Sequence, residues 1–208
     1  MAGAAPLAGL TVGITAERRA DEQAQLLRTR GAETVHGPTI AIVALEGDEH
    51  LRQTTLEVIA RPPDYLLAST GYGMRAWVEA AATWGLRDDL LDALGRARVA
   101  NRGAKAASAN GGFGLAQWWR APTERFEELV EHVLDQPLRH ASVVLQLHAT
   151  AMPATTARLQ AAGAEVVAVD AYHASLPADD APARALMEAA CAGRLAAVTF
   201  TTAPALHN

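Results

Sequence analysis

Hydroxyl side chains end several short apolar segments of this sequence, at positions that suit either helix capping or ligand binding. The residues concerned are Thr15, Ser69, Thr70, Thr201 and Thr202. Serine and threonine are favoured as N-caps of a following helix. A hydroxyl beside the backbone amides of a helix N-terminus also suits the binding of an anion. Both roles stay open, and one residue can serve both.

A phenol and several cations add to this set. Tyr172 lies in a β-rich segment, where it is either an ordinary packing residue or a hydrogen-bond donor to a ligand. Arg18 and Arg19 precede an expected helix, and Lys105 follows a turn at Gly103. Arginine can bind a carboxylate with two hydrogen bonds. The alternative is that these cations are solvated side chains at a helix start.

The elements that position these residues alternate between strand and helix. Leu10–Thr15 is a β-branched, apolar run that predicts a buried strand. Ala20–Arg30 has a helical pattern and is ended by Gly31, since glycine adopts the left-handed cap at little steric cost. Glu33–Val35 begins the next strand. This β-α-β order is typical of a parallel sheet covered by helices.

The same unit recurs further along the chain. Gly-Ala-Glu occurs at 31–33 and again at 163–165, an offset of 132. Ser69 and Thr201 each begin the paired hydroxyls after an apolar strand, and they are also 132 apart. Two matches in the same order and context predict an internal duplication. The second copy has only six residues after Thr202, so we expect about 40 residues of the repeat to be absent.

The repeat and two crossings predict the domain organisation. Pro38–Leu45 and Val169–His173 are apolar, β-rich and followed by polar, turn-prone sequence. The prediction is an α/β protein of two flavodoxin-like lobes with parallel sheets joined by a two-stranded connection. Residues 1–45 and 169–208 would form a terminal lobe that is incomplete, and 46–168 would form an inserted lobe.

Composition excludes several classes of protein. The 208 residues carry a net charge of −5, which argues against a nucleic-acid interface in this segment. The single cysteine, Cys191, excludes an internal disulfide and a multi-cysteine metal site, and it suits a reducing cytoplasm. Cys191 lies in an alanine-rich helical stretch and is expected to be buried. No signal peptide or membrane-spanning stretch is evident, so no membrane association is expected.

A series of short motifs resembles one enzyme family over nearly the whole chain. The motifs comprise a Thr-Arg-Pro-like turn, a Gly-Ala-Glu-Val-like step, a Thr-Ser-like strand end, a Gly-Pro-Lys-Thr-like turn, a Val-Tyr-Arg-Thr-like crossing and a Thr-Phe-Thr-Ser-like strand end. They stand here at 15–19, 31–38, 69–73, 103–106, 171–174 and 199–202. Their order and spacing are similar to those of uroporphyrinogen-III synthases, although Ala106 replaces a hydroxyl. The variant resembles the actinobacterial branch, whose members are in some cases fused to a winged-helix domain.

The resemblance implies a hydro-lyase of tetrapyrrole and haem biosynthesis that is cytoplasmic and monomeric. Its substrate would be hydroxymethylbilane, a linear tetrapyrrole that is closed with loss of water and inversion of the last pyrrole. It would need no cofactor and no metal. Tyr172 would help the hydroxyl leave. Substrate carboxylates would be bound by Thr15, Arg18, Ser69, Thr70, Gly71, Gly103, Lys105, Thr201 and Thr202. The alternative is a non-catalytic, ligand-sensing module of a transcriptional regulator.

Overall fold

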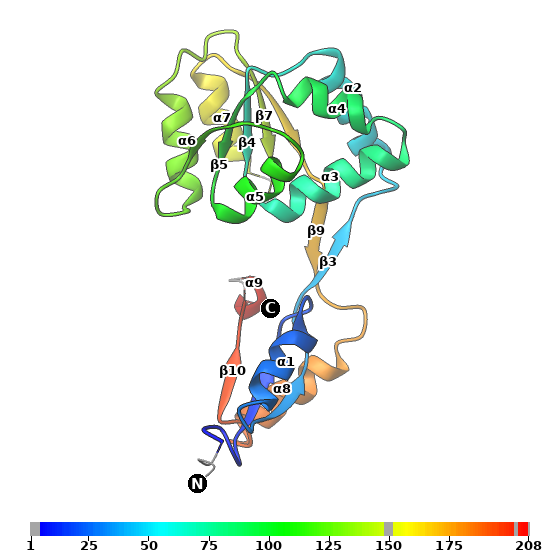
Figure 1. Cartoon of the computed structure of the whole chain (residues 1–208), viewed down its shortest axis with the longest axis vertical. Coiled ribbons are helices and arrows are strands. Elements are labelled where there is room, and N and C mark those ends of the chain that lie inside the picture. The colour runs from blue at the N-terminus through cyan, green and yellow to red at the C-terminus, as the bar shows by residue number, and fades with distance from the viewer. Residues whose placement is uncertain (1–4, 148–151, 202–203, 208) are drawn as a thin grey trace. The chain divides into compact units, whose positions relative to one another are not determined.

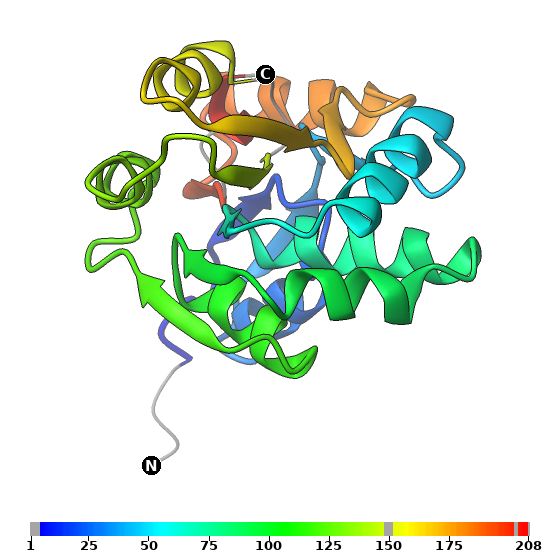
Figure 2. The ribbon, with the colours of Figure 1, turned by 90° about the horizontal axis from the view of Figure 1, so that it is seen from above.

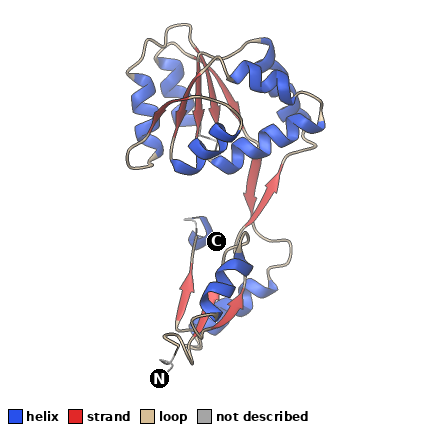
Figure 3. Ribbon diagram, viewed as in Figure 1, coloured by secondary structure: helices blue, strands red, loops and turns tan. Residues whose placement is uncertain are grey.

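Two compact units make up the chain (Figures 1 and 3). The structure is a computed structural model that describes residues 5–147, 152–201 and 204–207. The terminal unit comprises Met1–Val43 and Ala174–Asn208, and the inserted unit comprises Ala44–His173. Each unit contains a parallel sheet with helices packed on it. The predicted α/β class with two lobes and parallel sheets is confirmed.

The inserted unit contains a five-stranded sheet in the order β6-β5-β4-β7-β8. Every neighbouring pair in it is parallel. Its strands are β4 (Tyr65–Ala68), β5 (Arg98–Asn101), β6 (Gln117–Arg120), β7 (Ser142–Gln146) and β8 (Glu165–Val169). Its helices are α2 (Glu49–Ala60), α3 (Gly71–Thr83), α4 (Arg87–Leu94), α5 (Ala104–Gly112), α6 (Phe126–Leu134) and α7 (Pro153–Ala161).

Both faces of this sheet are buried, because successive strand residues point to opposite sides. Leu66 and Val144 contribute to a core with helices α2 to α5. Leu67 and Leu145 contribute to a second core with α6 and α7. Figure 2 shows these two sets of helices on opposite sides of the sheet. The strands are therefore apolar on both faces, as is typical of parallel sheets.

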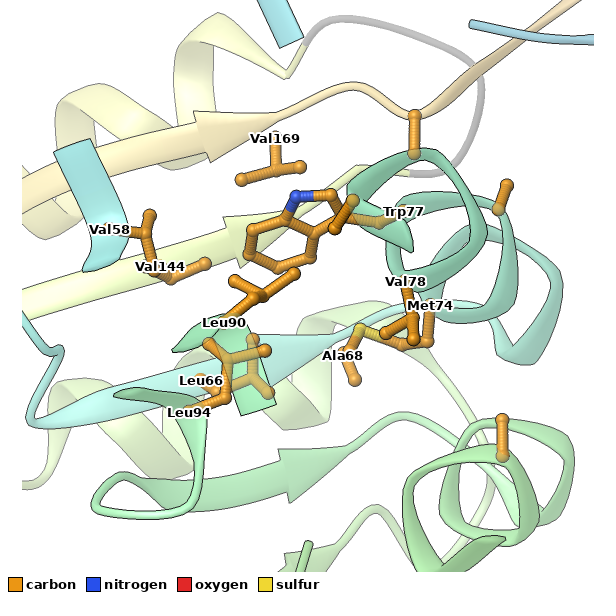
Figure 4. Close-up of a cluster of buried hydrophobic side chains, with 14 of the residues drawn as sticks. Val58, Leu66, Ala68, Met74, Trp77, Val78, Leu90, Leu94, Val144 and Val169 are labelled. Carbon is orange, nitrogen blue, oxygen red and sulfur yellow. The ribbon is translucent and has the colours of Figure 1, made fainter. Parts of the chain in front are cut away.

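Trp77 on α3 is the largest side chain that is fully buried (Figure 4). Its ring packs with Leu90, Val144 and Val169 in the first core. Its indole N–H donates to Thr55 Oγ1 at 2.9 Å, so the polar atom of this side chain is satisfied inside the core. The cluster fixes α3 against the sheet, and α3 begins at the candidate site described below.

The terminal unit contains a three-stranded parallel sheet in the order β10-β1-β2. Its elements are β1 (Thr11–Ile14), α1 (Ala20–Arg28), β2 (Glu33–His36), α8 (Ala181–Cys191), β10 (Ala197–Thr199) and α9 (Pro204–His207). Ile14 packs with Ala20 and Ala24 of α1. The residue before it, Gly13, faces Leu186 of α8. Because neighbouring strand residues point to opposite faces, α1 and α8 cover opposite sides of this sheet.

The two units repeat one β-α-β arrangement. Strands β10, β1 and β2 correspond at an offset of about 132 residues to β4, β7 and β8, and they lie in the same order in their sheets. Gly31 and Gly163, the two helix-ending glycines, have φ values of 93° and 94°. Both therefore adopt the left-handed conformation that favours glycine. Strands β5 and β6 extend the sheet of the inserted unit.

The two predicted crossings form a separate two-stranded sheet of β3 (Ala41–Ala44) and β9 (Tyr172–Ser175). The prediction that Cys191 is buried is wrong, because its side chain is exposed at the end of α8. Helix α8 presents Leu186 to the sheet. Cys191 lies five residues later, about 140° around the helix axis at 100° per residue, and so points away from that sheet.

Candidate functional site

The candidate site lies at the carboxyl ends of the strands in the inserted unit. Strand β4 ends at Ala68, and Ser69 and Thr70 then lead directly into α3. Strand β7 pairs with β4 so that its last residue, Gln146, lies beside Ala68. Ligands of open α/β sheets bind at this edge, where loops and helix N-termini converge. The polar residues gathered here therefore carry the strongest functional expectation.

Thr70 is the N-cap of α3 and also a neighbour of Tyr172. Its backbone is extended, and its Oγ1 accepts a hydrogen bond from Gly73 N–H at 3.0 Å. The same Oγ1 lies 3.3 Å from the Tyr172 phenolic oxygen. Thr70 therefore caps the helix, as one interpretation of the sequence predicts. It also leaves its own hydroxyl proton available for a second partner.

Tyr172 begins β9 and is buried, with 6% of its surface exposed. Its ring makes an edge-to-face contact with Tyr72, with 4.9 Å between the ring centroids. Burial raises the pKa of the Tyr172 phenol, and the Thr70 hydrogen bond and the charge of Arg102 oppose this only in part. The phenol is therefore protonated near neutral pH, where it can donate but not accept a proton in a reaction.

Gln146 is a polar residue of this site that the sequence interpretation missed. Its Oε1 accepts from the Thr70 backbone N–H at 2.9 Å and lies 3.4 Å from Ser69 Oγ. The signal was present in the sequence, because a glutamine interrupts the otherwise apolar run from Val143 to Leu147. Arg102, half-buried at the end of β5, was also missed although it acts electrostatically on Tyr172.

The starts of α3 and α5 pack closely. A Cβ at Gly71 would lie only 2.7 Å from the Lys105 carbonyl carbon, so this approach requires glycine. Lys105 itself is exposed. The N-terminus of α5 is occupied by the protein's own carboxylate, since Glu124 Oε1 accepts from Ala104 N–H at 2.9 Å. A Cβ at Gly103 would lie 2.8 Å from that carboxyl carbon. The anion position expected at this turn is therefore already filled.

The remaining candidates belong to the terminal unit. Thr15 is buried, and its hydroxyl donates to the Thr199 carbonyl at 2.8 Å, which ties the end of β1 to β10. Arg19 pairs with Glu22 on the surface of α1. Thr201 is exposed just after β10. Arg18 is also exposed at the helix start, and Thr202 lies outside the described residues. The Thr70–Tyr172 contact is thus formed entirely by the inserted unit.

Metal-ligand clusters and membrane-spanning helices are both missing from the described part of the chain. Within residues 5–147, 152–201 and 204–207, no group of three or more His, Cys, Asp or Glu side chains is placed to hold a metal ion. In the same part of the chain, no helix has the length and apolarity needed to cross a membrane.

One family model and one protein of known sequence match this chain. The sequence profile described as "Uroporphyrinogen-III synthase HemD" matches residues 21–208. An uncharacterized protein of Bacillus subtilis (strain 168), YjjA, is 27% identical over 202 residues, which are 95% of this chain and 72% of that protein.

Solved structures of uroporphyrinogen III synthase from the extremely thermophilic bacterium Thermus thermophilus are also similar to this chain. A mutant selenomethionine derivative matches with a TM-score of 0.77 and 27% identity, covering 96% of this chain and 75% of the other. The wild-type protein matches with a TM-score of 0.66 and 27% identity, covering 96% and 74%.

Proposed function

This chain belongs to the uroporphyrinogen-III synthase family, and from that premise we propose that it performs the reaction for which the family is named. It would close hydroxymethylbilane into a ring with loss of water and inversion of the last pyrrole. The observation that carries the proposal is the Thr70–Tyr172 contact at the carboxyl edge of the sheet. It sets a buried, protonated phenol beside a capped helix start in a chain of this family.

Tyr172 would act on the hydroxyl that leaves. Its O–H donates a hydrogen bond to the hydroxyl oxygen of the substrate, which weakens the bond from carbon to oxygen. The electron-rich pyrrole supplies the electron pair that replaces this bond, and the hydroxyl departs as water with the proton of the Tyr172 phenol. A ring carbon then forms the closing carbon–carbon bond and loses a proton, and a proton returns to the Tyr172 oxygen. Holding the flexible chain in one geometry accounts for much of the catalysis.

Carboxylate arms of the substrate would be held by backbone amides, hydroxyls and cations. We assign this role to Thr15, Arg18, Ser69, Thr70, Gly71, Gly103, Lys105, Thr201 and Thr202. Thr15 could take an arm only if its hydroxyl leaves the Thr199 carbonyl, to which it now donates. Half-buried Arg102 is a further candidate in the inserted unit, because its charge already acts on the phenol of Tyr172. Gly103 could take an arm only if the Glu124 carboxylate leaves the start of α5, since that carboxylate now accepts from Ala104 N–H.

The proposal is tested by Tyr172→Phe with Tyr65→Phe as its matched control. Tyr65 is the first residue of β4, and Thr70 follows the last residue of that strand by two positions. Tyr65 therefore lies at the amino-terminal end of the strand, away from the candidate site. We expect Tyr172→Phe to lower the rate of formation of the inverted ring isomer about 10- to 100-fold, which corresponds to the loss of a hydrogen bond worth about 1.5 to 3 kcal/mol. Tyr65→Phe should retain that rate.

Closure with inversion of the last pyrrole and closure without it yield different ring isomers, so the isomer formed reports directly on the proposed reaction. An unchanged rate in Tyr172→Phe would remove the role proposed for the phenol. A wild-type protein that binds a linear tetrapyrrole but never yields the inverted isomer would instead favour the ligand-sensing alternative. Both outcomes are read from the ratio of the two isomers and a binding titration on the same sample.

A further inference from the structure

We propose that Gln146 is a positioning residue of this site: its buried amide fixes the Ser69–Thr70 turn and so sets the Thr70 hydroxyl against the Tyr172 phenol. The effect of Gln146 on catalysis rests on the proposed function. The hydrogen-bond arrangement does not depend on that function and can be tested without turnover.

The amide of Gln146 has only one orientation that satisfies its partners. The side chain is fully buried, its Oε1 accepts from Thr70 N–H at 2.9 Å, and its Nε2 donates to the Leu147 carbonyl. A backbone N–H can only donate and a carbonyl can only accept. Rotating the amide by half a turn would therefore place donor against donor and acceptor against acceptor, so the network itself assigns the oxygen and the nitrogen.

Gly73 provides the space that this amide needs. A Cβ at that position would lie 2.7 Å from Gln146 Cδ and 2.9 Å from Thr70 Oγ1. The first turn of α3 can thus lie against the amide only because it has no side chain there. The glycine, the glutamine and the threonine form one packed unit, which restrains the turn from both the strand and the helix.

Strand β7 does not need a glutamine for its own packing. Its preceding residues Val143, Val144 and Leu145 are buried and apolar, and an apolar residue would also satisfy the strand. Burying an amide is costly unless both of its ends find partners. Here the Gln146 oxygen is satisfied by the Thr70 N–H and its nitrogen by the Leu147 carbonyl. We infer that a glutamine is present at this position because it holds the Ser69–Thr70 turn.

Gln146 affects Tyr172 indirectly, through the position of the Thr70 hydroxyl. Gly73 N–H already donates to Thr70 Oγ1, so the Thr70 hydroxyl proton can be given to the Tyr172 oxygen 3.3 Å away. In that arrangement the phenol accepts from Thr70, and its own hydrogen remains available for a ligand. Fixing the Thr70 backbone fixes the direction of its Oγ1. Gln146 therefore acts on the phenol through Thr70 and does not itself touch the substrate.

The first measurement is hydrogen exchange at the Thr70 amide, followed by NMR. Gln146→Met keeps a long, unbranched side chain but removes both hydrogen-bonding groups. We expect exchange at Thr70 to become about tenfold faster or more. The control is Thr55→Val, which deletes two other buried hydrogen bonds, the one from Trp77 to Thr55 and the one from Thr55 to the Leu51 carbonyl. It should leave the ratio of Thr70 exchange to that of its neighbours unchanged. Equal protection in Gln146→Met and the wild type would overturn the proposal.

The second measurement is a double-mutant cycle with Thr70→Val. Gln146→Met alone should lower kcat for hydroxymethylbilane about tenfold and change KM less than about twofold. In the Thr70→Val background the same change should alter kcat by less than about twofold, because the intermediary is already lost. Effects that multiply in full would show that Gln146 acts as a general structural residue and would refute the assigned role.

A third measurement separates this inference from the proposed function. Tyrosinate absorbance of Tyr172, obtained by subtracting the matching Tyr172→Phe curve, requires no substrate. Gln146→Met and Thr70→Val should each raise the pKa of the phenol, since each weakens the hydrogen bond that lowers it, and the double variant should raise it no further. If the wild type makes no ring and these shifts appear, only the proposed function fails. If the wild type is active and the shifts are absent, only the inference on Gln146 fails.

Discussion

The substitution Gly73→Ala is a direct test of how tightly the start of α3 is packed. In an open helix this change would be favourable by about 1 kcal/mol, because alanine has the higher helix propensity. At Gly73 the added Cβ would lie 2.7 Å from Gln146 Cδ and 2.9 Å from Thr70 Oγ1. Both neighbours are held by hydrogen bonds, so neither can move without losing one.

The expected net effect is a loss of about 2 kcal/mol in the free energy of unfolding. If Gln146 moves aside, the two hydrogen bonds of its amide are lost, at about 1 kcal/mol each. Residual overpacking adds about 1 kcal/mol or more. The gain of about 1 kcal/mol in helix propensity offsets only part of this sum.

Urea unfolding followed by tryptophan fluorescence suits this test. All four tryptophans, at positions 77, 84, 118 and 119, lie in the inserted unit, so the signal reports on the unit that is changed. We expect the midpoint to fall by about 1 M urea. The matched control is Gly111→Ala in α5, where an added Cβ would meet nothing within 4 Å. It should be neutral or stabilising. If Gly73→Ala behaved like Gly111→Ala, the packing argument would be refuted.

Three further outcomes are expected. Because burial raises the pKa of Tyr172, the stability that its neutral phenol contributes should be fully present below pH about 10, the pKa of an unfolded tyrosine. It should be lost as the pH rises through the higher folded value, which unfolding measured against pH for the wild type and Tyr172→Phe would reveal. Glu124→Gln keeps an acceptor for Ala104 N–H but removes a negative charge, so KM for an anionic substrate should fall about two- to fivefold; a raised KM would contradict this. Trp77→Ala should cost about 3 to 5 kcal/mol in urea unfolding, since it empties a fully buried site and leaves Thr55 without its donor.

The local sequence pattern was sufficient to predict the repeated architecture. Apolar runs, helix-ending glycines and the offset of 132 residues predicted two parallel α/β lobes, and Gly31 and Gly163 share the left-handed conformation that ends their helices. Such features depend on chemistry within a few residues, and the chain repeats them. The exposure of a single helical side chain cannot be predicted from such local features. Cys191 was expected to be buried from composition alone, whereas the direction of its helix face decides that it is exposed.

The sequence by itself determined which residue types are available to the site, namely the hydroxyls at strand ends and the phenol of Tyr172. It left open whether Thr70 caps a helix or binds a ligand, and the structure shows it as the N-cap of α3. Only the tertiary structure decided which of them meet. Thr70 and Tyr172 are 102 positions apart, and Gln146 reaches the turn because β7 pairs with β4 in register. Sheet pairing and close helix packing are long-range events, so the partners of a polar side chain cannot be found from spacing along the chain.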